Sequence, residues 1–316
     1  MNSDSYAHHF DIVFARRADG PAPRFIHLIE QEAHKRGLIF VHCQNHDQAE
    51  LMRLSVENYT LAIGCLIDYM GRSFCNDTEF LQIVRERGGL VVDDPELVER
   101  YGNKASMHYA LERAGITLPR TLIWPAHQPS RDLTVKEQRY LGARFVCKPS
   151  YGSGASGVRL DMGASCAAID AAREYDRDDD FLLQEFITPL DFHGRPAWFR
   201  VYNCFGTIFA CWWHPETHAT YLLSSEEISY YHLFGLERIS RVIAAISGYT
   251  WFSCEIAVTM RAQRRVFVPV DYLNNKCYML THSEVGEHGL PDILAEMVAA
   301  CLVERAQAHI RKTMPS

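Results

Sequence analysis

Two carboxylates lie in apolar surroundings in the C-terminal half of the chain. Glu255 lies within FSCEIAV, and Asp271 lies within VFVPVDYLNN, which ends at Asn274 and Asn275. Carboxylate and amide oxygens are the hard ligands that magnesium takes when it also binds phosphate groups. The alternative is a pair of charges on a solvated sheet face. The valines and isoleucines around both acids disfavour it, because an unpaired buried carboxylate is costly.

A glycine- and serine-rich stretch, VCKPSYGSGASGVRL, follows a lysine near the middle of the chain. Its glycines at 152, 154 and 157 match the G-x-G-x-x-G pattern of dinucleotide sites. In those sites a helix begins directly after the last glycine, whereas residues 158–162 alternate as a strand does. The stretch also lacks the G-K-S/T ending of a Walker loop. Its lysine precedes the glycines, whereas the lysine of a protein kinase follows them.

The remaining interpretation of this stretch is two strands joined by a loop that covers phosphate groups. Small residues let backbone N–H groups approach phosphate oxygens, and Lys148 would add a positive charge. A surface hairpin with a solvated lysine explains the stretch alone equally well. The other pieces of the sequence must therefore decide between the two.

Three such pieces occur in the same chain. FLLQEFI is an apolar strand that could form a slot whose backbone pairs with an adenine edge, although such a strand more often runs into a loop at a sheet edge. Lys104 opens a predicted helix, where a lysine is usually exposed. Arg200 lies in the aromatic strand WFRVY, and an arginine there is harder to explain as a surface residue.

These residues depend on the elements that position them, and the sequence pattern of the first third of the chain indicates strands and helices in alternation. That order predicts a parallel sheet with flanking helices. A proline-containing stretch at 116–134 then predicts an extended crossing between domains. The strands predicted here are 10–15, 38–43 and 90–94, and the helices are 25–37, 78–89 and 104–115.

The rest of the chain mixes strands and helices, so the predicted class is α/β, with an α+β arrangement in the C-terminal half. The predicted strands are 144–150, 157–162, 181–187, 198–213, 250–260 and 264–273, and the predicted helices are 167–176, 236–248 and 291–310.

In this order the motifs resemble the ATP-grasp superfamily, from about residue 62 to residue 292. The segment from GLVVDD to LPRTL resembles the pre-grasp segment with its phosphate lysine, and VCKPSYGSGASGV resembles the second lysine and the phosphate-covering loop. LLQEFI resembles the adenine-pairing hinge, and CEIAV and VPVDYLNN resemble the metal strands. The resemblance implies an ATP-grasp fold with an N-terminal βαβ pre-grasp domain at 1–100, a central lid subdomain at 101–183 and a C-terminal metal and substrate subdomain at 184–316.

The resemblance also implies a role for each matching residue. Arg200 and Lys148 would be catalytic, with Arg200 stabilising the transferred phosphoryl group or an acyl phosphate. The remaining assignments are Lys104, Lys148, Ser153, Gly154, Ala155 and Ser156 for ATP phosphates, Gln184, Glu185, Phe186 and Ile187 for adenine, Asp191 for ribose, and Glu255, Asp271 and Asn274 for one or two magnesium ions.

Two departures from the family pattern affect these assignments. The family commonly has Glu-x-Asn at the second metal strand, whereas this chain has Asp271 followed by Asn274 and Asn275. In an ideal strand Asn275 would share the face of Asp271, so a bend or bulge must decide which asparagine is a ligand. The acid often found two residues before the arginine is Trp198 here.

The reaction that the resemblance implies is ATP-dependent joining of a carboxylate to an amine through an acyl phosphate, with release of ADP and phosphate. A small-molecule kinase is one alternative, although few basic residues beyond Arg261, Arg264 and Arg265 could bind a polyanion. A catalytically silent nucleotide-binding protein is the other. It would require the loss of a metal carboxylate or a phosphate lysine, and the sequence retains both.

Composition restricts the partners and the compartment. The 316 residues carry a formal charge of −7 without a basic block, which disfavours nucleic acid or an anionic membrane as a partner. Ten scattered cysteines without a C-x-x-C pair indicate free thiols in a reducing cytoplasm, and no zinc site or reactive Cys75 is predicted. We expect a cytoplasmic enzyme that uses ATP and Mg²⁺ on a small-molecule carboxylate and amine, and a homodimer is left open.

Overall fold

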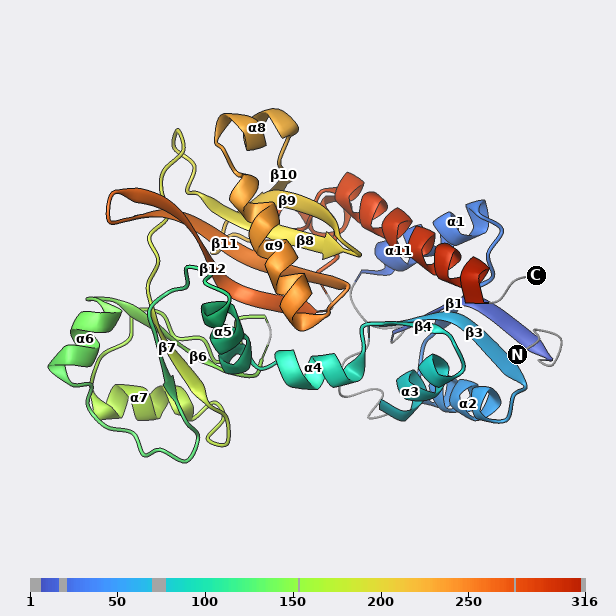
Figure 1. The fold of residues 1–316 in the computed structure, drawn as a ribbon, viewed down its shortest axis with the longest axis horizontal. Helices are drawn as coiled ribbons and strands as arrows, with labels where there is room; N and C mark the ends of the chain where they lie inside the picture. Colours follow the sequence, from blue (N-terminus) through green and yellow to red (C-terminus); the bar gives the residue numbers. More distant parts are fainter. Residues whose placement is uncertain (1–6, 17–21, 70–77, 153, 276, 314–316) are drawn as a thin grey trace.

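The computed structural model describes residues 7–16, 22–69, 78–152, 154–275 and 277–313, so Cys75 and Ser153 lie outside the described residues. The described chain forms a four-stranded, a three-stranded and a five-stranded sheet, each with helices beside it. In Figure 1 the four-stranded sheet lies on the right, the three-stranded sheet at the lower left and the five-stranded sheet above the centre.

The four-stranded sheet is parallel throughout, in the order β2-β1-β3-β4, which confirms the parallel sheet predicted for the first third of the chain. Helix α2 and strand β3 were not among the predicted elements. Helix α2 buries only Ala49 and Val56, so its sequence carries a weak apolar period. The elements here are β1 (His8–Ala15), α1 (Pro23–Lys35), β2 (Phe40–Cys43), α2 (His46–Glu57), β3 (Leu61–Asp68), α3 (Thr78–Glu86) and β4 (Leu90–Val92).

The three-stranded sheet is antiparallel, in the order β5-β7-β6. Its edge strand β5 lies inside the stretch predicted as an extended crossing, because TLIW fits between Pro119 and Pro125 and pairs with β7. The elements are β5 (Thr121–Trp124), α6 (Val135–Leu141), β6 (Phe145–Pro149), α7 (Cys166–Arg173) and β7 (Phe181–Glu185).

The strand predicted at 157–162 is wrong in extent. Only Arg159 pairs there, in an isolated bridge in which its N–H and C=O both bond to Cys147. The backbone turns at Asp161, which has a positive φ of 57°, and an extended strand cannot continue through that conformation.

The five-stranded sheet is antiparallel, in the order β10-β9-β8-β11-β12, and α9 covers one face of it (Figure 1). Ile239 and Ile243 of α9 pack against Phe199 and Ile256 of the sheet. The elements are β8 (Trp198–Cys204), β9 (Thr207–Trp213), β10 (Thr220–Leu222), α8 (Ser225–Tyr230), α9 (Phe234–Ser247), β11 (Trp251–Arg261) and β12 (Arg264–Asn275).

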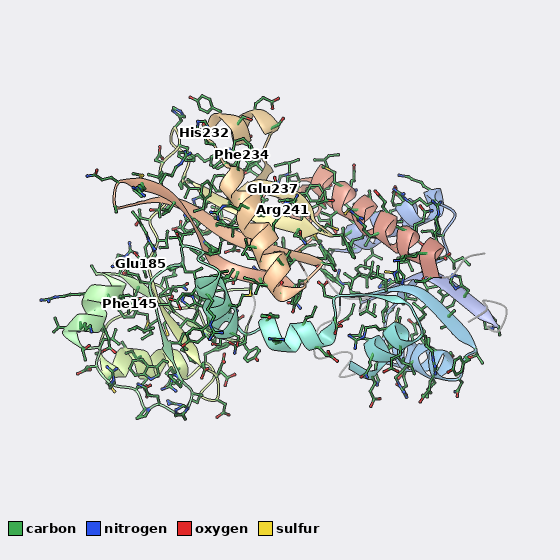
Figure 2. The ribbon with its side chains drawn as sticks, viewed as in Figure 1. Phe145, Glu185, His232, Phe234, Glu237 and Arg241 are labelled. Carbon is green, nitrogen blue, oxygen red and sulfur yellow. The ribbon has the colours of Figure 1, made fainter. Side chains whose placement is uncertain are left out.

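The outer side of α9 is polar. Figure 2 labels Glu237 and Arg241 there, one helical turn apart, and Arg241 Nε donates to Glu237 Oε1 at 2.8 Å. Helix α5 (Lys104–Arg113) adds Met107 and Leu111 to the apolar core beneath α9. The residue that opens α5, Lys104, is therefore held against the five-stranded sheet rather than on a separate unit.

The end of the described chain returns to its beginning. Helix α4 (Pro95–Tyr101) leads out of the first sheet, and α10 (His282–Val285) and a 3-10 turn (Gly286–His288) precede the long helix α11 (Asp292–Thr313). Helix α11 packs against α1, β1 and β3 and completes the core of the four-stranded sheet. The predicted division into three parts at residues 100 and 183 stays a prediction. Helix α5, from the predicted central part, packs under α9 of the C-terminal part, and α11, from the C-terminal part, packs against the N-terminal sheet.

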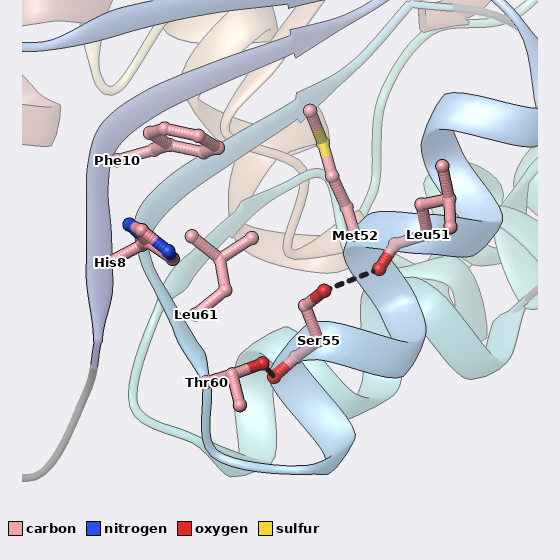
Figure 3. Close-up of a pocket in the computed structure, with 7 residues that line it drawn as sticks. All are labelled: His8, Phe10, Leu51, Met52, Ser55, Thr60 and Leu61. Atoms are coloured by element: carbon pink, nitrogen blue, oxygen red, sulfur yellow. Dashed lines mark hydrogen bonds between the residues drawn. The ribbon is translucent and has the colours of Figure 1, made fainter.

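A hollow of about 180 Å³ opens at the amino end of β1, beside α2. Phe10, Leu51, Met52 and Leu61 make it largely apolar (Figure 3). Of the polar groups at its rim, the Ser55 hydroxyl donates to the Leu51 carbonyl at 2.7 Å. The hollow therefore lies at the amino end of β1, whereas Arg16 follows the carboxyl end of the strand.

Two further findings concern the described chain as a whole. None of its helices combines the length and the apolar character that crossing a membrane requires. The nine cysteines within the described ranges carry free thiols, and most of them are buried.

The contact between β3 and α11 predicts the effect of a small substitution. A Cβ at Gly64 would come within 2.6 Å of the Ile310 side chain and 2.8 Å of the Asp11 carbonyl oxygen. We expect Gly64→Ala to lower the free energy of unfolding by about 1–3 kcal/mol through overpacking, measured by chemical denaturation. Gly163→Ala is the control, because its Cβ would meet only Ala168 at 3.4 Å. Equal stability of the two variants would contradict the packing seen here.

Candidate active site

Three charged side chains form a row across the five-stranded sheet. The strand register places Arg200 of β8 opposite Glu255 of β11, and Glu255 opposite Asp271 of β12. Their neighbours Phe199, Cys254 and Ile256 belong to the core under α9, so the row lies on the other face, because side chains alternate along a strand. Arg200 donates a hydrogen bond from Nη2 to Glu255 Oε1. The structure thus brings together three of the predicted site residues.

A bulge in β12 decides between the two asparagines. Ser253 pairs with Asn274 and Glu255 pairs with Asp271, so β12 carries one more residue than β11 over this interval. The bulge turns Asn274 to the side of Asp271, and Asn274 Nδ2 donates to Asp271 Oδ2 at 3.0 Å. Asn275 pairs instead with Phe252, whose side chain lies in the core under α9.

The acids of the row have the properties of a cation site. Burial raises the pKa of Glu255 above its ordinary value and Asp271 raises it further, while Arg200 opposes the change. Asp271 Oδ1 is buried and has no hydrogen-bond partner within the described residues. A cation would satisfy this oxygen and relieve the repulsion between the carboxylates. Glu255, Asp271 and the Asn274 amide oxygen therefore fit a magnesium ion.

Such an ion would need further ligands from outside the protein. Within the described ranges, no three histidine, cysteine, aspartate or glutamate side chains gather as a metal site. Two carboxylates and one amide leave half of an octahedral shell open, and magnesium commonly fills such positions with phosphate oxygens and water.

The two predicted phosphate lysines converge beside this row. Lys148 of β6 is buried, and its Nζ donates to the Val270 carbonyl at 2.7 Å, next to Asp271. Burial lowers its pKa to about 8, Asp271 and Glu255 oppose the change, and Lys104 contributes to it. Lys104 Nζ donates to the Gly152 carbonyl at 2.6 Å. Because each ammonium group is destabilised by the charge of the other, the pair favours a bound anion.

The predicted phosphate loop turns tightly next to Lys104. Gly152, Gly154, Ala155 and Gly157 all have positive φ, from 58° at Ala155 to 132° at Gly152. The conformation favours glycine, and a Cβ at Gly157 would also come within 2.6 Å of the Tyr175 ring. Ser156 lies in the same turn.

The residues that lead into the loop are anchored to the turn before β7. The Tyr151 N–H donates to Asp179 Oδ2 at 2.7 Å, and the Ser150 N–H donates to the Asp180 carbonyl at 2.8 Å. The Ser150 hydroxyl is buried and has no hydrogen-bond partner within the described residues. It is a second polar group, after Asp271 Oδ1, that this part of the protein leaves unpaired.

The predicted adenine residues form the end of β7 and the segment just after it, and their side chains are largely engaged. Glu185, labelled in Figure 2, forms ion pairs with Arg120 at 2.8 Å and Arg261 at 2.5 Å. Ile187 is buried against Ala257 and Val268. The Arg144 guanidinium lies 4.2 Å from the centre of the Phe186 ring. Any pairing with adenine would therefore use the backbone of this segment, as the resemblance implies.

The predicted ribose residue, Asp191, lies in an exposed turn. Its Oδ1 accepts a hydrogen bond of 2.7 Å from the Gly194 N–H. This carboxylate therefore stabilises its own turn in the structure, and its role toward ribose stays a prediction.

A buried hydrogen-bond chain behind Lys148 was not predicted from the sequence. Gln184 Nε2 donates to the Tyr272 hydroxyl at 2.9 Å, and this hydroxyl lies 2.6 Å from His108 Nδ1, to which it can donate in turn. Burial, with a smaller contribution from Lys148, lowers the pKa of His108 to about 4. A histidine in the middle of a helix and a tyrosine next to Asp271 carry no signal in the sequence that they meet.

This buried histidine predicts a pH dependence of stability. Unfolded His108 takes up a proton near pH 6.5 and folded His108 only near pH 4, so between these values the unfolded state binds more protons. The free energy of unfolding should therefore fall as the pH is lowered from 6.5 to 4, by up to about 3 kcal/mol from this group.

The measurement is urea denaturation across this pH range. His108→Asn keeps an acceptor for Tyr272 but does not titrate, so it should lose less stability than the wild type. His27→Asn, which removes an exposed histidine, is the control and should follow the wild type. Parallel curves for the wild type and His108→Asn would contradict the assignment.

No family model and no curated protein matches this chain in sequence. Solved structures do match it over nearly its full length. An ATP-grasp RimK domain protein from Sphaerobacter thermophilus has a TM-score of 0.61 at 16% identity, over 93% of this chain and 99% of that one. D-alanine–D-alanine ligase from Bacillus anthracis, complexed with ATP, has a TM-score of 0.60 at 12% identity, over 95% and 98%.

A third match is the ATP-grasp ligase PsnB, complexed with a variant of its minimal precursor, Mg and ADP. Its TM-score is 0.61 at 13% identity, over 95% of this chain and 98% of that one. The three proteins share little sequence with this chain, so they bear on its architecture alone. The chain has the ATP-grasp fold.

Proposed function

We propose that this protein is an ATP-dependent ligase that joins a carboxylate to an amine and releases ADP and phosphate. The observation that carries the proposal is the row of Arg200, Glu255 and Asp271, with its unpaired carboxylate oxygen, beside the buried Lys148. Two of the similar structures named above are ligases, one of them described with ATP and one with Mg and ADP. Those similarities support the proposal through the fold.

The lysines would bind the phosphates of ATP. Lys104 now donates to a loop carbonyl and Lys148 to a strand carbonyl, and phosphate oxygens are stronger acceptors for both ammonium groups. A phosphate between them would also remove their mutual repulsion. Magnesium, held by Glu255, Asp271 and Asn274, would neutralise phosphate charge when bound.

Arg200 would act on the transferred group. A carboxylate oxygen of the substrate attacks the terminal phosphorus of ATP, and the bond between that phosphorus and ADP breaks. The guanidinium keeps Nη2 on Glu255, while its buried Nε has no partner within the described residues and can donate to the phosphoryl oxygens. Burial works to lower the pKa of Arg200, but Glu255 and Tyr202 together outweigh it and raise the pKa, so the arginine stays charged.

In the second half of the reaction the amine attacks the acyl carbon. The bond between that carbon and the phosphate oxygen breaks, phosphate leaves with the electron pair, and the amine loses a proton. Water must be excluded because an acyl phosphate hydrolyses. Residues 150–157 would cover the site for this purpose.

The alternative functions lose support in the structure. A kinase for polyanions would need free basic residues near its acceptor. Of the three arginines considered above, Arg261 is bound to Glu185 and the Leu118 carbonyl, and Arg265 donates to the Tyr231 carbonyl. That leaves Arg264, an exposed residue, and one arginine is few for a polyanion. A silent nucleotide-binding protein would lack a lysine or an acid of the site, and all four are in place.

The test of this proposal is ADP release with mixtures of small carboxylates and amines in the presence of ATP and magnesium. We expect activity with some mixtures, and a loss of about 100-fold or more in Asp271→Asn, because the metal ligand is removed. Asp170→Asn is the control, since Asp170 is a half-exposed residue of α7 that pairs with Arg177. Undiminished activity in Asp271→Asn would contradict the site, and ATP binding without any ADP release would identify a silent protein.

The bulge in β12 generates a separate prediction about metal binding. Asn274→Ala should weaken the affinity for Mn²⁺, used as a probe in the presence of ADP, by about ten-fold, because an amide ligand is lost. Asn275→Ala should leave it unchanged, since Asn275 lies on the other face of the sheet. Electron paramagnetic resonance of unbound Mn²⁺ measures both affinities. A larger effect of Asn275→Ala would show that the other asparagine is the ligand.

A further inference from the structure

A group of tyrosines, of which Tyr202 is fully buried, extends the row of charges toward the four-stranded sheet. Tyr202 lies two residues beyond Arg200 on the same face of β8, and its hydroxyl interacts with Arg200. Tyr69 follows β3, and its hydroxyl donates to the Cys277 carbonyl. Burial raises the pKa of Tyr278, Glu284 raises it further and Arg200 lowers it, so Tyr278 lies within the fields of both charges.

Arg16 lies at the far end of this group of tyrosines. It follows β1 directly, its residue is only 3% exposed, and its guanidinium lies 5.1 Å from the centre of the Tyr69 ring. Its backbone is fixed, since the Arg16 N–H donates to the Cys43 carbonyl and the Arg16 carbonyl lies 2.8 Å from His42 Nε2. Its Nη1 is buried and has no hydrogen-bond partner within the described residues.

Arg16 occupies the part of a parallel sheet where ligands bind. In the order β2-β1-β3-β4 the chain leaves β1 to one side and β3 lies on the other, so the ends of β1 and β3 flank the crevice of the sheet. Arg16 follows β1 and Tyr69 follows β3. In Figure 1 both strands run from the right-hand edge of the molecule toward its centre. There the Tyr69 ring stacks on Trp251, the first residue of β11, with ring centres 5.6 Å apart.

Several buried nitrogens near Arg16, Tyr69 and Arg200 are hydrogen-bond donors without a partner in the described part of the chain, whereas the unpaired atom at the proposed metal site is an acceptor. Arg16 Nη1, Arg200 Nε, Trp213 Nε1 and Trp251 Nε1 are all buried donors without a partner within the described residues, whereas Asp271 Oδ1 is an acceptor. Trp213 adjoins Arg200, whose guanidinium lies 4.7 Å from its ring centre. Each unpaired buried donor is costly, and a ligand that brings acceptor oxygens removes the cost.

The nearby carboxylate of Glu284 does not supply the hydrogen-bond acceptor that Arg16 Nη1 lacks among the described residues. Glu284 acts on Arg16 through its charge, but both of its oxygens are engaged elsewhere. Oε2 accepts from the Thr281 N–H and hydroxyl at 2.9 and 3.1 Å, and Oε1 accepts from the Arg24 N–H at 3.3 Å. The guanidinium therefore keeps a donor for a planar oxyanion, and carboxylates match its geometry.

We propose that Arg16 binds a carboxylate group that does not react, so that one of the two substrates carries this group in addition to its reacting one. Either the acid that is activated is a dicarboxylate, or the amine is an amino acid that retains its carboxylate. The assignment of the reacting groups rests on the proposed ligase function, whereas binding of the carboxylate at Arg16 does not.

The first experiment measures binding without turnover. The wild-type protein, loaded with ADP and magnesium, is titrated calorimetrically with small dicarboxylates and amino acids, each paired with the amide that replaces its non-reacting carboxylate. We expect the wild type to bind some acids at least about ten-fold more tightly than their amides, and Arg16→Gln to lose this preference. Arg16→Lys should retain part of it.

A second experiment identifies which substrate carries the group. Hydroxylamine replaces the amine and traps the activated acid as a hydroxamate. If the acid carries the carboxylate, Arg16→Gln raises the KM for the acid in this assay. If the amine carries it, hydroxamate formation is unchanged and only the KM for the amine rises. Either result supports the proposal, and a fall in kcat with both KM values unchanged would overturn it.

Two controls separate binding from folding. Arg16→Gln should melt close to the temperature of the wild type, because the loss of the contact with Tyr69 is offset by removal of a buried nitrogen, Nη1, that has no hydrogen-bond partner within the described residues. Arg36→Gln removes an arginine that is bonded to Glu32 at 2.9 Å, and it should leave the preference for acids intact. A large loss of melting temperature in both Arg16→Gln and Arg16→Lys would assign Arg16 to the core and overturn the proposal.

The outcomes also separate this proposal from the ligase function. Equal binding of acids and amides by the wild type, or no binding of any acid, overturns the role of Arg16. An unchanged preference in Arg16→Gln does so as well. A preference that depends on Arg16, without ADP release from any mixture, supports the carboxylate site while the ligase function fails.

Discussion

Two carboxylates facing each other across neighbouring strands impose the main constraint on this structure. Glu255 and Asp271 are held in buried surroundings, where their repulsion is strong and must be balanced. Arg200 supplies one positive charge from the same sheet, and Lys148 supplies another from the three-stranded sheet. The balance is left incomplete at Asp271 Oδ1, and the proposed metal site rests on this unpaired oxygen.

The same constraint explains why the three sheets must be placed accurately. Lys148 extends from β6 to a carbonyl of β12, and Lys104 at the start of α5 donates to the loop that follows β6. Arg16 comes from the four-stranded sheet. Its guanidinium lies beside the ring of Tyr69, and Tyr69 in turn stacks on Trp251 of the five-stranded sheet. The five-stranded sheet thus contributes both acids and Arg200, whereas the other two sheets contribute the basic residues Lys148 and Arg16.

The sequence predicted the parts of the site that depend on local pattern. Glu255 and Asp271 stood out because apolar residues alternate around them, and the lysines stood out beside glycines or at a helix start. Long-range effects were not predictable: the β12 bulge selects Asn274, the positive φ of Asp161 ends a strand, and Arg120 and Arg261 engage Glu185. Neither Arg16 nor His108 has a neighbour in sequence that indicates its partner in space.

The return of α11 to the first sheet has a consequence for the order in which the protein can fold. Leu294, Val298 and Leu302 of α11 complete the core around Ile12, Phe14 and Phe25. During synthesis these early residues emerge well before residues 292–313, so the part of this face that α11 covers stays exposed while the roughly 200 residues between β4 and α11 are made. The segment that is synthesised first therefore reaches its final packing among the last, and a chaperone that shields β1 and β3 would matter most during this interval.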